Sequence, residues 1–66
     1  MPNHFRFAWM SGAGEWRVSD EYGCFLGSIA ETRDGFKATG LTRGTLRTRL
    51  FPSREAAARW LSEIAD

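Results

Sequence analysis

The sequence predicts an α+β fold, a small antiparallel meander of four to five strands packed by one C-terminal amphipathic helix. Between residues 4 and 51, short segments alternate apolar with polar side chains and are separated by glycine-containing connections, which is typical of antiparallel hairpins. From residue 53 onward the apolar side chains recur at helical spacing instead. At 66 residues the chain has room for one hydrophobic core, so we expect residues 1–66 to form a single domain.

The first two strands are predicted over residues 4–10 and 15–19, on either side of a hairpin connection at residues 11–14. Both segments alternate with a period of two, which is typical of half-buried strands. The apolar side chains that share one face of these two strands are Phe5, Phe7, Trp9, Trp16 and Val18.

The third predicted strand, residues 22–31, lacks a regular alternation because Gly27 and small residues beside it interrupt the apolar set. A glycine inside a strand favours a bulge or a close approach of another backbone, so the register of this strand stays open. The dipeptide Asp34-Gly35 then predicts a tight turn, since glycine accepts the positive φ that such a hairpin needs.

The fourth strand is predicted over residues 36–39 and is expected to end at Gly40, which leaves residues 41–44 as a mobile basic loop. The fifth strand, residues 45–51, divides its side chains between two faces. We expect one set to be buried and the other to be solvated. The buried set is Leu46, Thr48 and Leu50, and the solvated set is Thr45, Arg47 and Arg49.

The only predicted helix begins after Pro52, with Ser53 as its N-cap, because a serine hydroxyl can accept from the free N–H groups of the first turn. Its apolar residues fall at i, i+3, i+4 and i+7 and form one stripe that we expect to cover the sheet. These residues are Ala57, Trp60, Leu61 and Ile64.

The chain offers little for catalysis, metal binding or membrane insertion. Its only histidine, His4, and its only cysteine, Cys24, have no partner at the spacing that a nucleophilic pair or a metal site requires. We therefore expect a non-enzymatic protein without cofactor or metal, with Cys24 as a small buried side chain. No apolar run approaches the roughly 18 residues of a membrane span, and one cysteine cannot form an internal disulfide. These features predict a cytoplasmic location.

Basic residues are concentrated in the second half of the chain. Residues 1–32 carry two basic and four acidic side chains, whereas residues 33–66 carry seven basic and four acidic ones. This asymmetry favours an anionic partner, and arginine suits bidentate contacts with phosphate or guanine. The candidate residues for binding double-stranded DNA are Lys37, Arg43, Arg47 and Arg49.

The arginines could equally have an origin unrelated to DNA. A GC-rich genome enriches arginine together with alanine and glycine, and charged side chains on a strand protect a sheet edge from unwanted pairing. The aromatic residues suggest a different partner surface, because one helix covers only one face of a sheet. Tyr22, Phe25 or part of the first strand would then contact another protein or a second copy of the chain.

Residues 51–61, FPSREAAARWL, resemble the corresponding stretch of the AP2-like amino-terminal DNA-binding domains of phage-type integrases. In that family an aromatic ends the last strand, a capped helix follows, and the helix packs onto a three-stranded sheet that binds arm-type DNA sites. The resemblance implies that Lys37, Arg47 and Arg49 face DNA. This chain has an additional aromatic strand and no recombinase catalytic domain, so the resemblance implies a stand-alone binder.

The sequence thus leads to two hypotheses. The first is a non-enzymatic DNA-binding or regulatory module that neutralises phosphates with the arginine-bearing face of its C-terminal strands. The alternative is a small protein-interaction or inhibitor module, including a homodimer, encoded on a phage, plasmid or other mobile element.

Overall fold

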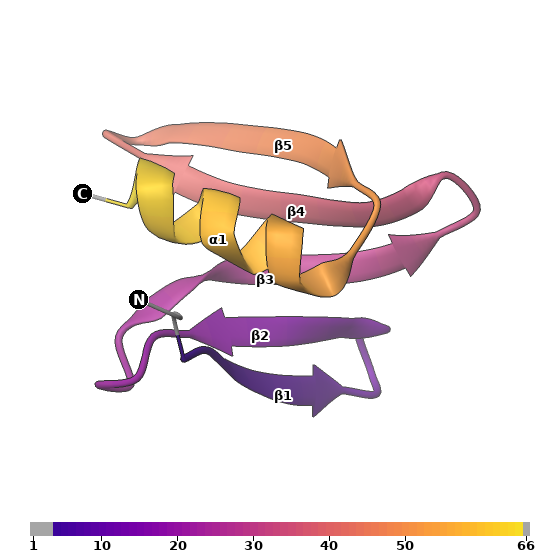
Figure 1. Cartoon of the computed structure of the whole chain (residues 1–66), viewed down its shortest axis with the longest axis horizontal. Coiled ribbons are helices and arrows are strands. Elements are labelled where there is room, and N and C mark those ends of the chain that lie inside the picture. The colour runs from indigo at the N-terminus through magenta and orange to yellow at the C-terminus, as the bar shows by residue number, and fades with distance from the viewer. Residues whose placement is uncertain (1–3, 66) are drawn as a thin grey trace.

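Five strands followed by one helix make up the structure, a computed structural model that describes residues 4–65 (Figure 1). Each strand pairs antiparallel with its neighbour in sequence, so the sheet order is β1-β2-β3-β4-β5. The predicted α+β meander with one C-terminal helix is confirmed, with five strands. The elements are β1 (Arg6–Met10), β2 (Glu15–Ser19), β3 (Phe25–Thr32), β4 (Gly35–Thr42), β5 (Thr45–Phe51) and α1 (Arg54–Ile64).

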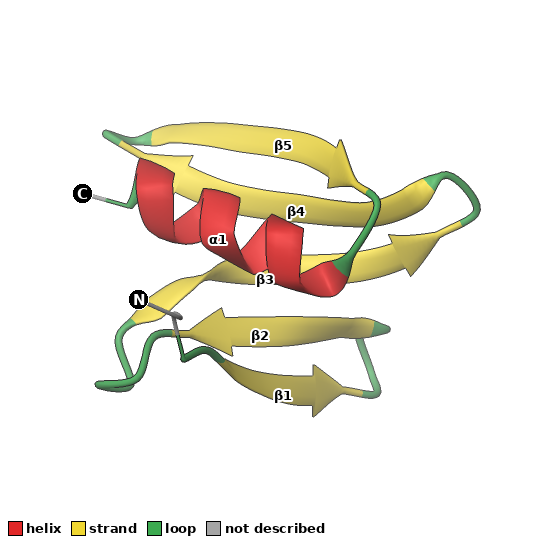
Figure 2. Cartoon of the chain, viewed as in Figure 1, coloured by secondary structure: helices red, strands yellow, loops and turns green. Residues whose placement is uncertain are grey.

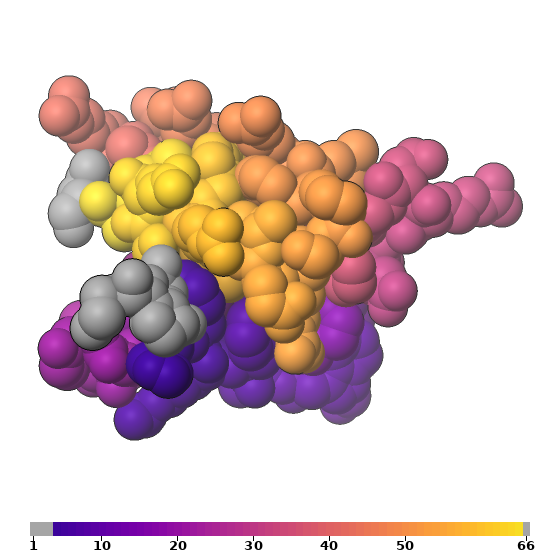
Figure 3. All heavy atoms as spheres, viewed as in Figure 1, coloured from indigo at the N-terminus to yellow at the C-terminus, as the bar shows by residue number. Residues whose placement is uncertain are grey.

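The helix covers only part of one sheet face. It crosses that face over β3, β4 and β5, while the β1–β2 hairpin lies beyond the edge of the helix (Figure 2). In the space-filling view from the helix side, α1 fills the centre and the turn between β3 and β4 projects at one end (Figure 3). No described element covers the opposite face of the sheet, which is called the open face below.

The core is small and forms between the middle of the sheet and the inner stripe of the helix. Its fully buried side chains come from three strands and three positions of the helix, and half-buried aromatic rings surround them. Because neighbours that pair directly across an antiparallel sheet share a face, the pairing of Ile29 with Ala38 places both under α1. The buried residues are Val18, Ile29, Ala38, Ala57, Ala58 and Leu61.

The predicted irregularity at Gly27 is present. The register between β2 and β3 shifts between Val18 and Ser19, so that Val18 pairs with Gly27 but Ser19 pairs with Phe25. A Cβ on Gly27 would lie 2.5 Å from the Thr39 carbonyl oxygen. Glycine is therefore required here by the close approach of β4.

The fourth strand is longer than the sequence suggested. It continues through Gly40 to Thr42, and only Arg43 and Gly44 form the connection to β5. Both turn residues have positive φ, 50° for Arg43 and 79° for Gly44, which is the two-residue hairpin geometry that matches the twist of the strands. The predicted mobile loop over residues 41–44 is thus wrong. Gly40 did not end the strand, because the helix packs directly on it: a Cβ there would lie 2.8 Å from a methyl carbon of Leu61.

The prediction for β5 holds for one set of side chains and is wrong for the other: Thr45, Arg47 and Arg49 are exposed as predicted, but Leu46, Thr48 and Leu50 are not buried. Arg49 pairs with buried Ala38, and Arg47 pairs with Gly40, so both arginines stand on the face that carries the helix. Leu46, Thr48 and Leu50 lie on the open face and are exposed. The alternation along β5 showed that its side chains form two sets on opposite faces. We expected the more apolar set to be buried. The structure places the helix on the other side.

Helix α1 begins as predicted. The Ser53 side chain accepts a hydrogen bond from the Ala56 backbone N–H at 3.1 Å. Cys24, expected to be buried, is instead exposed in the segment between β2 and β3. Its backbone N–H donates to Asp20 Oδ1 at 2.9 Å, which fixes this turn.

Candidate interaction surface

The open face carries three exposed leucines at the β4–β5 end of the sheet. The exposed fractions are 61% for Leu41, 68% for Leu46 and 49% for Leu50. Leu41 pairs directly with Leu46 across the two strands, so their side chains are neighbours on that face. These three residues are called the leucine patch below.

A row of small polar side chains crosses the open face between the Leu41–Leu46 pair and Leu50. Ladder pairs connect Arg17 to Ser28, Ser28 to Thr39 and Thr39 to Thr48. The hydroxyls of Thr39 and Thr48 lie 3.5 Å apart. Hydroxyls and leucines next to one another give a surface that can bury apolar area and still form hydrogen bonds, as the centre of a protein interface does.

Positive charge flanks this surface. Lys37 pairs with Leu50 and therefore stands on the open face. Further across, the guanidinium carbon of Arg17 lies 4.8 Å from the ring centroid of Phe25, which is 58% exposed. Glu15 also stands on the open face, because it lies two residues before Arg17 on β2 and alternate residues of a strand share a face.

The predicted DNA-binding residues are divided between the two faces. Arg47 and Arg49 stand on the helix side of β5, and Arg43 lies in the turn at the end of this strand. These three residues are called the arginine edge below. Lys37 points to the open face and does not join them.

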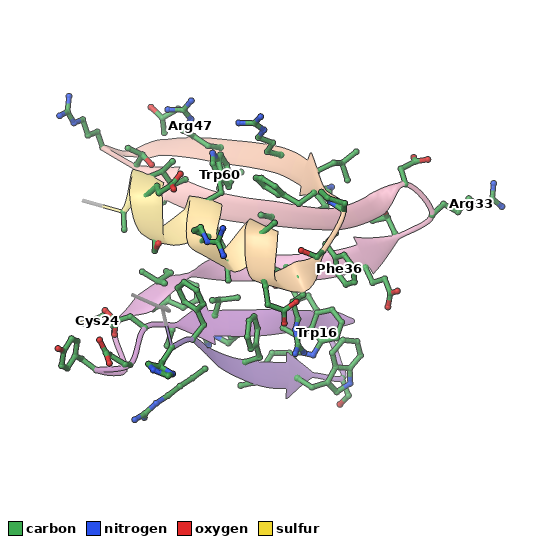
Figure 4. The ribbon with its side chains drawn as sticks, in the orientation of Figure 1. Trp16, Cys24, Arg33, Phe36, Arg47 and Trp60 are labelled. Carbon is green, nitrogen blue, oxygen red and sulfur yellow. The ribbon has the colours of Figure 1, made fainter. Side chains whose placement is uncertain are left out.

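Figure 4 shows Arg47 of the arginine edge on β5, beyond the outer flank of the helix. Small residues on β4, Ala38 and Gly40, let the helix sit close to the sheet, and the longer arginines occupy the margin beyond it. The guanidinium carbon of Arg49 lies 5.4 Å from the ring centroid of Phe51. Neither Arg47 nor Arg49 forms an ion pair with a residue between 4 and 65.

A shallow depression separates the end of α1 from the β4–β5 hairpin. Arg43, Arg47 and Glu63 line it together with neighbouring polar groups. The helix has no basic residue in its last turn. Arg43 and Arg47 stand beside the residues that end the helix, where the negative end of the helix dipole favours positive charge whether or not a ligand binds.

The leucine patch was missed because the fifth strand was assigned the wrong buried face. Of the aromatic residues expected to be exposed, Tyr22 is 83% and Phe25 58% exposed. Trp9, 56% exposed, and half-buried Phe7 stand on the helix side, because they pair with Trp16 and Val18. Contact of these aromatics with a partner stays a prediction. Gly40 could have indicated the patch. It shares a face of β4 with Ala38, and two small residues on one face of a strand mark the face that a helix can approach closely.

The side chains that commonly bind metal ions are dispersed over residues 4–65. No group of three or more metal-ligating side chains comes together among them. His4 and Cys24 are both exposed. Within the same residues, the helix is too short and too polar to cross a membrane.

Comparison with protein-family models, curated proteins and solved structures found no match to this chain. The resemblance of residues 51–61 to integrase amino-terminal domains therefore stays a prediction. The candidate sites rest on the geometry described above.

Proposed function

We propose that the protein is a small non-enzymatic protein-interaction module that binds its partner through the leucine patch on the open face of β4 and β5. The observation that carries this proposal is the exposure of Leu41, Leu46 and Leu50 on a face that no described element covers. The chain has five leucines in total, so three of its five stand outside the core.

The energetic argument follows from the size of the chain. Burying a leucine side chain stabilises a fold by about 1.5–3 kcal/mol, and a domain of this length has little apolar area to spare. Among residues 4–65 the core contains three large fully buried side chains, Ile29, Leu61 and Val18. Three leucines exposed on one uncovered face of so small a domain favour burial against a partner over a purely structural role.

Position-specific crosslinking tests this proposal. A photoreactive phenylalanine analogue replaces Leu46 or Leu50 in the producing cells, and two matched chains carry it at Arg33 or Arg59, which are exposed elsewhere. We expect a discrete crosslinked species from the two leucine positions and none from the two arginine positions. A Leu41→Ser substitution should weaken the crosslink from position 46.

Equal crosslinking from all four positions, or none from the leucine positions, would contradict the proposal. A crosslinked species of twice the mass of the chain would identify a second copy as the partner. The leucine positions can be replaced without disturbing the core, because their side chains are about half exposed or more.

A second candidate function is binding of double-stranded DNA by the arginine edge. The observation that favours it is the gathering of Arg43, Arg47 and Arg49 along one strand edge. Alternate residues of a strand are about 6–7 Å apart, a spacing that can follow successive phosphates. The hypothesis changes in one respect, since Lys37 stands on the opposite face and is no longer part of the set.

Fluorescence anisotropy of a labelled random duplex at about 50 mM and about 200 mM salt tests DNA binding. Micromolar binding at the lower salt that is lost at the higher salt supports it, since phosphate contacts release counterions. The double variant Arg47→Ala, Arg49→Ala should abolish this binding, and the matched double variant Arg33→Ala, Arg59→Ala should retain most of it. Binding that is unaffected by the first variant would remove the arginine edge from consideration.

A further inference from the structure

Strand β5 is an edge of the sheet, and its outer backbone groups have no strand beside them within the described chain. The two-residue turn at Arg43 and Gly44 makes Thr42 and Thr45 the first hydrogen-bonded pair of the hairpin. Hydrogen-bonded pairs alternate along an antiparallel ladder. The backbone groups of Leu46, Thr48 and Leu50 therefore point outward from the sheet.

The same three residues present their side chains on the open face, while Arg47 and Arg49 between them stand on the helix side. A strand added along this edge would continue both faces of the sheet. Its side chains on one face would lie beside leucines and a threonine, and its side chains on the other face would lie beside two guanidinium groups. The edge thus specifies different chemistry for alternate residues of the added strand.

A second copy of this chain is a poor occupant of the edge in the register that pairs all seven residues of β5. Antiparallel pairing of two β5 strands centred on Thr48 would place Arg47 of each opposite Arg49 of the other. Like charges directly opposite one another destabilise a strand pair. An acidic strand has the complementary charge, and neither arginine has an ion-pair partner among residues 4–65.

The other edge of the sheet lacks these features. Strand β1 has five residues, against seven in β5. Its only charged residue is Arg6, at the beginning of the strand. Positive charge is therefore repeated along β5 and not along β1.

We propose that β5 binds an extended segment of a partner protein in which acidic and apolar residues alternate, and that this segment joins the sheet as a sixth strand. Its acidic residues pair with Arg47 and Arg49, and its apolar residues extend the leucine patch. The proposal rests on the protein-interaction function and states the chemistry and the binding mode of the partner.

The probe is a capped octapeptide of alternating glutamate and valine, measured at about 50 mM salt. Three control peptides have lysine in place of glutamate, the same residues in two blocks of four, or N-methyl groups on alternate backbone amides. Two N-methylated forms are made, one with methyl groups on the valines and one with them on the glutamates. In an added strand only one of these sets faces β5.

The expected result is binding of the glutamate-valine peptide at least tenfold tighter than that of the lysine-valine or the block peptide. One N-methylated form should lose at least tenfold in affinity and the other should stay within about threefold. Hydrogen exchange at the amides of Leu46, Thr48 and Leu50 should slow when the peptide binds. Exchange at the amides of Phe7 and Trp9 on β1 should not change.

Charge-reversal variants supply the matched test. The double variant Arg47→Glu, Arg49→Glu should lose at least tenfold in affinity for the glutamate-valine peptide and should prefer the lysine-valine peptide. The double variant Arg33→Glu, Arg59→Glu changes the net charge equally at exposed positions elsewhere and should bind as the parent does.

Several outcomes would overturn the inference. Two concern the peptides: equal affinity for the glutamate-valine and lysine-valine peptides, or an equal loss of affinity in both N-methylated forms. Two concern other occupants of the edge: protection of the β5 amides by self-association without peptide, or binding of duplex DNA at this edge with no binding of the peptide. If crosslinks form from positions 46 and 50 but the peptide fails to bind, the interaction function stands and the strand-addition mode is wrong. If neither is observed, both are wrong.

Discussion

The guanidinium carbon of Arg54 lies 4.1 Å from the ring centroid of Phe7, and 5.3 Å from that of Trp16. Arg54 is the first residue of α1, and the two rings belong to β1 and β2. Figure 4 shows Trp16 beside Phe36 near the beginning of the helix, and their ring centroids are 6.2 Å apart. Because the body of the helix covers β3 to β5, these contacts connect the helix with the first hairpin.

Replacing Arg54 with alanine should reduce the free energy of unfolding by about 0.5–2 kcal/mol, because it removes two cation–π contacts and the packing of the aliphatic stem. The ion pair with Glu55, at 3.6 Å between side chains that are 35% and 65% exposed, should add little to this loss. Urea denaturation followed by circular dichroism measures the effect. Arg59→Ala, on the exposed side of the same helix, is the control and should change stability by less than about 0.5 kcal/mol. Equal losses from both variants would show that the ring contacts contribute nothing.

Gly27→Ala should be among the most destabilising single substitutions, because the added Cβ would lie 2.5 Å from the Thr39 carbonyl oxygen and 2.9 Å from a Leu61 methyl carbon. Forcing an extra methyl group into a packed core costs about 1–3 kcal/mol. The matched variant is Gly12→Ala, whose Cβ has no atom within 4 Å. Thermal unfolding of the two variants compares them directly, and a Gly27→Ala protein as stable as Gly12→Ala would show that β3 and β4 are not so close.

Ser53→Ala should destabilise the protein by about 0.5–2 kcal/mol, because the Ala56 N–H loses its acceptor at the beginning of the helix. The comparison is Ser62→Ala. The Ser62 hydroxyl donates to the Arg59 carbonyl within the helix, an interaction that contributes little to stability. Chemical denaturation should therefore show a larger loss of stability for Ser53→Ala than for Ser62→Ala. A larger loss for Ser62→Ala would contradict the role of Ser53 as the N-cap.

Thr42→Val should destabilise the protein by about 1–3 kcal/mol. The Thr42 hydroxyl donates to the Ile64 carbonyl oxygen at 2.9 Å in a partly buried position, and valine leaves this acceptor without its donor. Faster hydrogen exchange near the end of α1 should accompany the loss. Thr48→Val on the exposed open face is the control, and it should leave both the stability and the exchange almost unchanged. If the end of the helix exchanges equally fast in both variants, the Thr42 contact does not hold it.

The sequence predicted the elements because each carries its own local signal. Period-two alternation identified β1, β2 and β5, and the Asp34-Gly35 dipeptide identified the turn between β3 and β4. The serine N-cap and the helical apolar stripe identified α1. Such signals depend on neighbouring residues only, so they can be interpreted without knowledge of the tertiary structure.

The candidate surfaces were predicted less well. Three of the four predicted DNA-binding residues are brought together, but Lys37 is separated from them by the thickness of the sheet. The error in assigning the buried face came from β5. This edge strand is exposed on both faces, so its more apolar face is not the more buried one. The buried face is marked by Ala38 and Gly40 on β4, whose small size allows the helix to approach.

Local sequence therefore determined which segments are strands, where the helix begins and that the chain forms one small sheet with one helix. Which face of that sheet the helix covers was decided only in the tertiary structure, by the fit of Leu61 and Ile64 over Gly40. The physical reason is that alternation divides a strand into two faces without saying which one meets another layer. That choice placed the leucine patch on the open face and the arginines beside the helix.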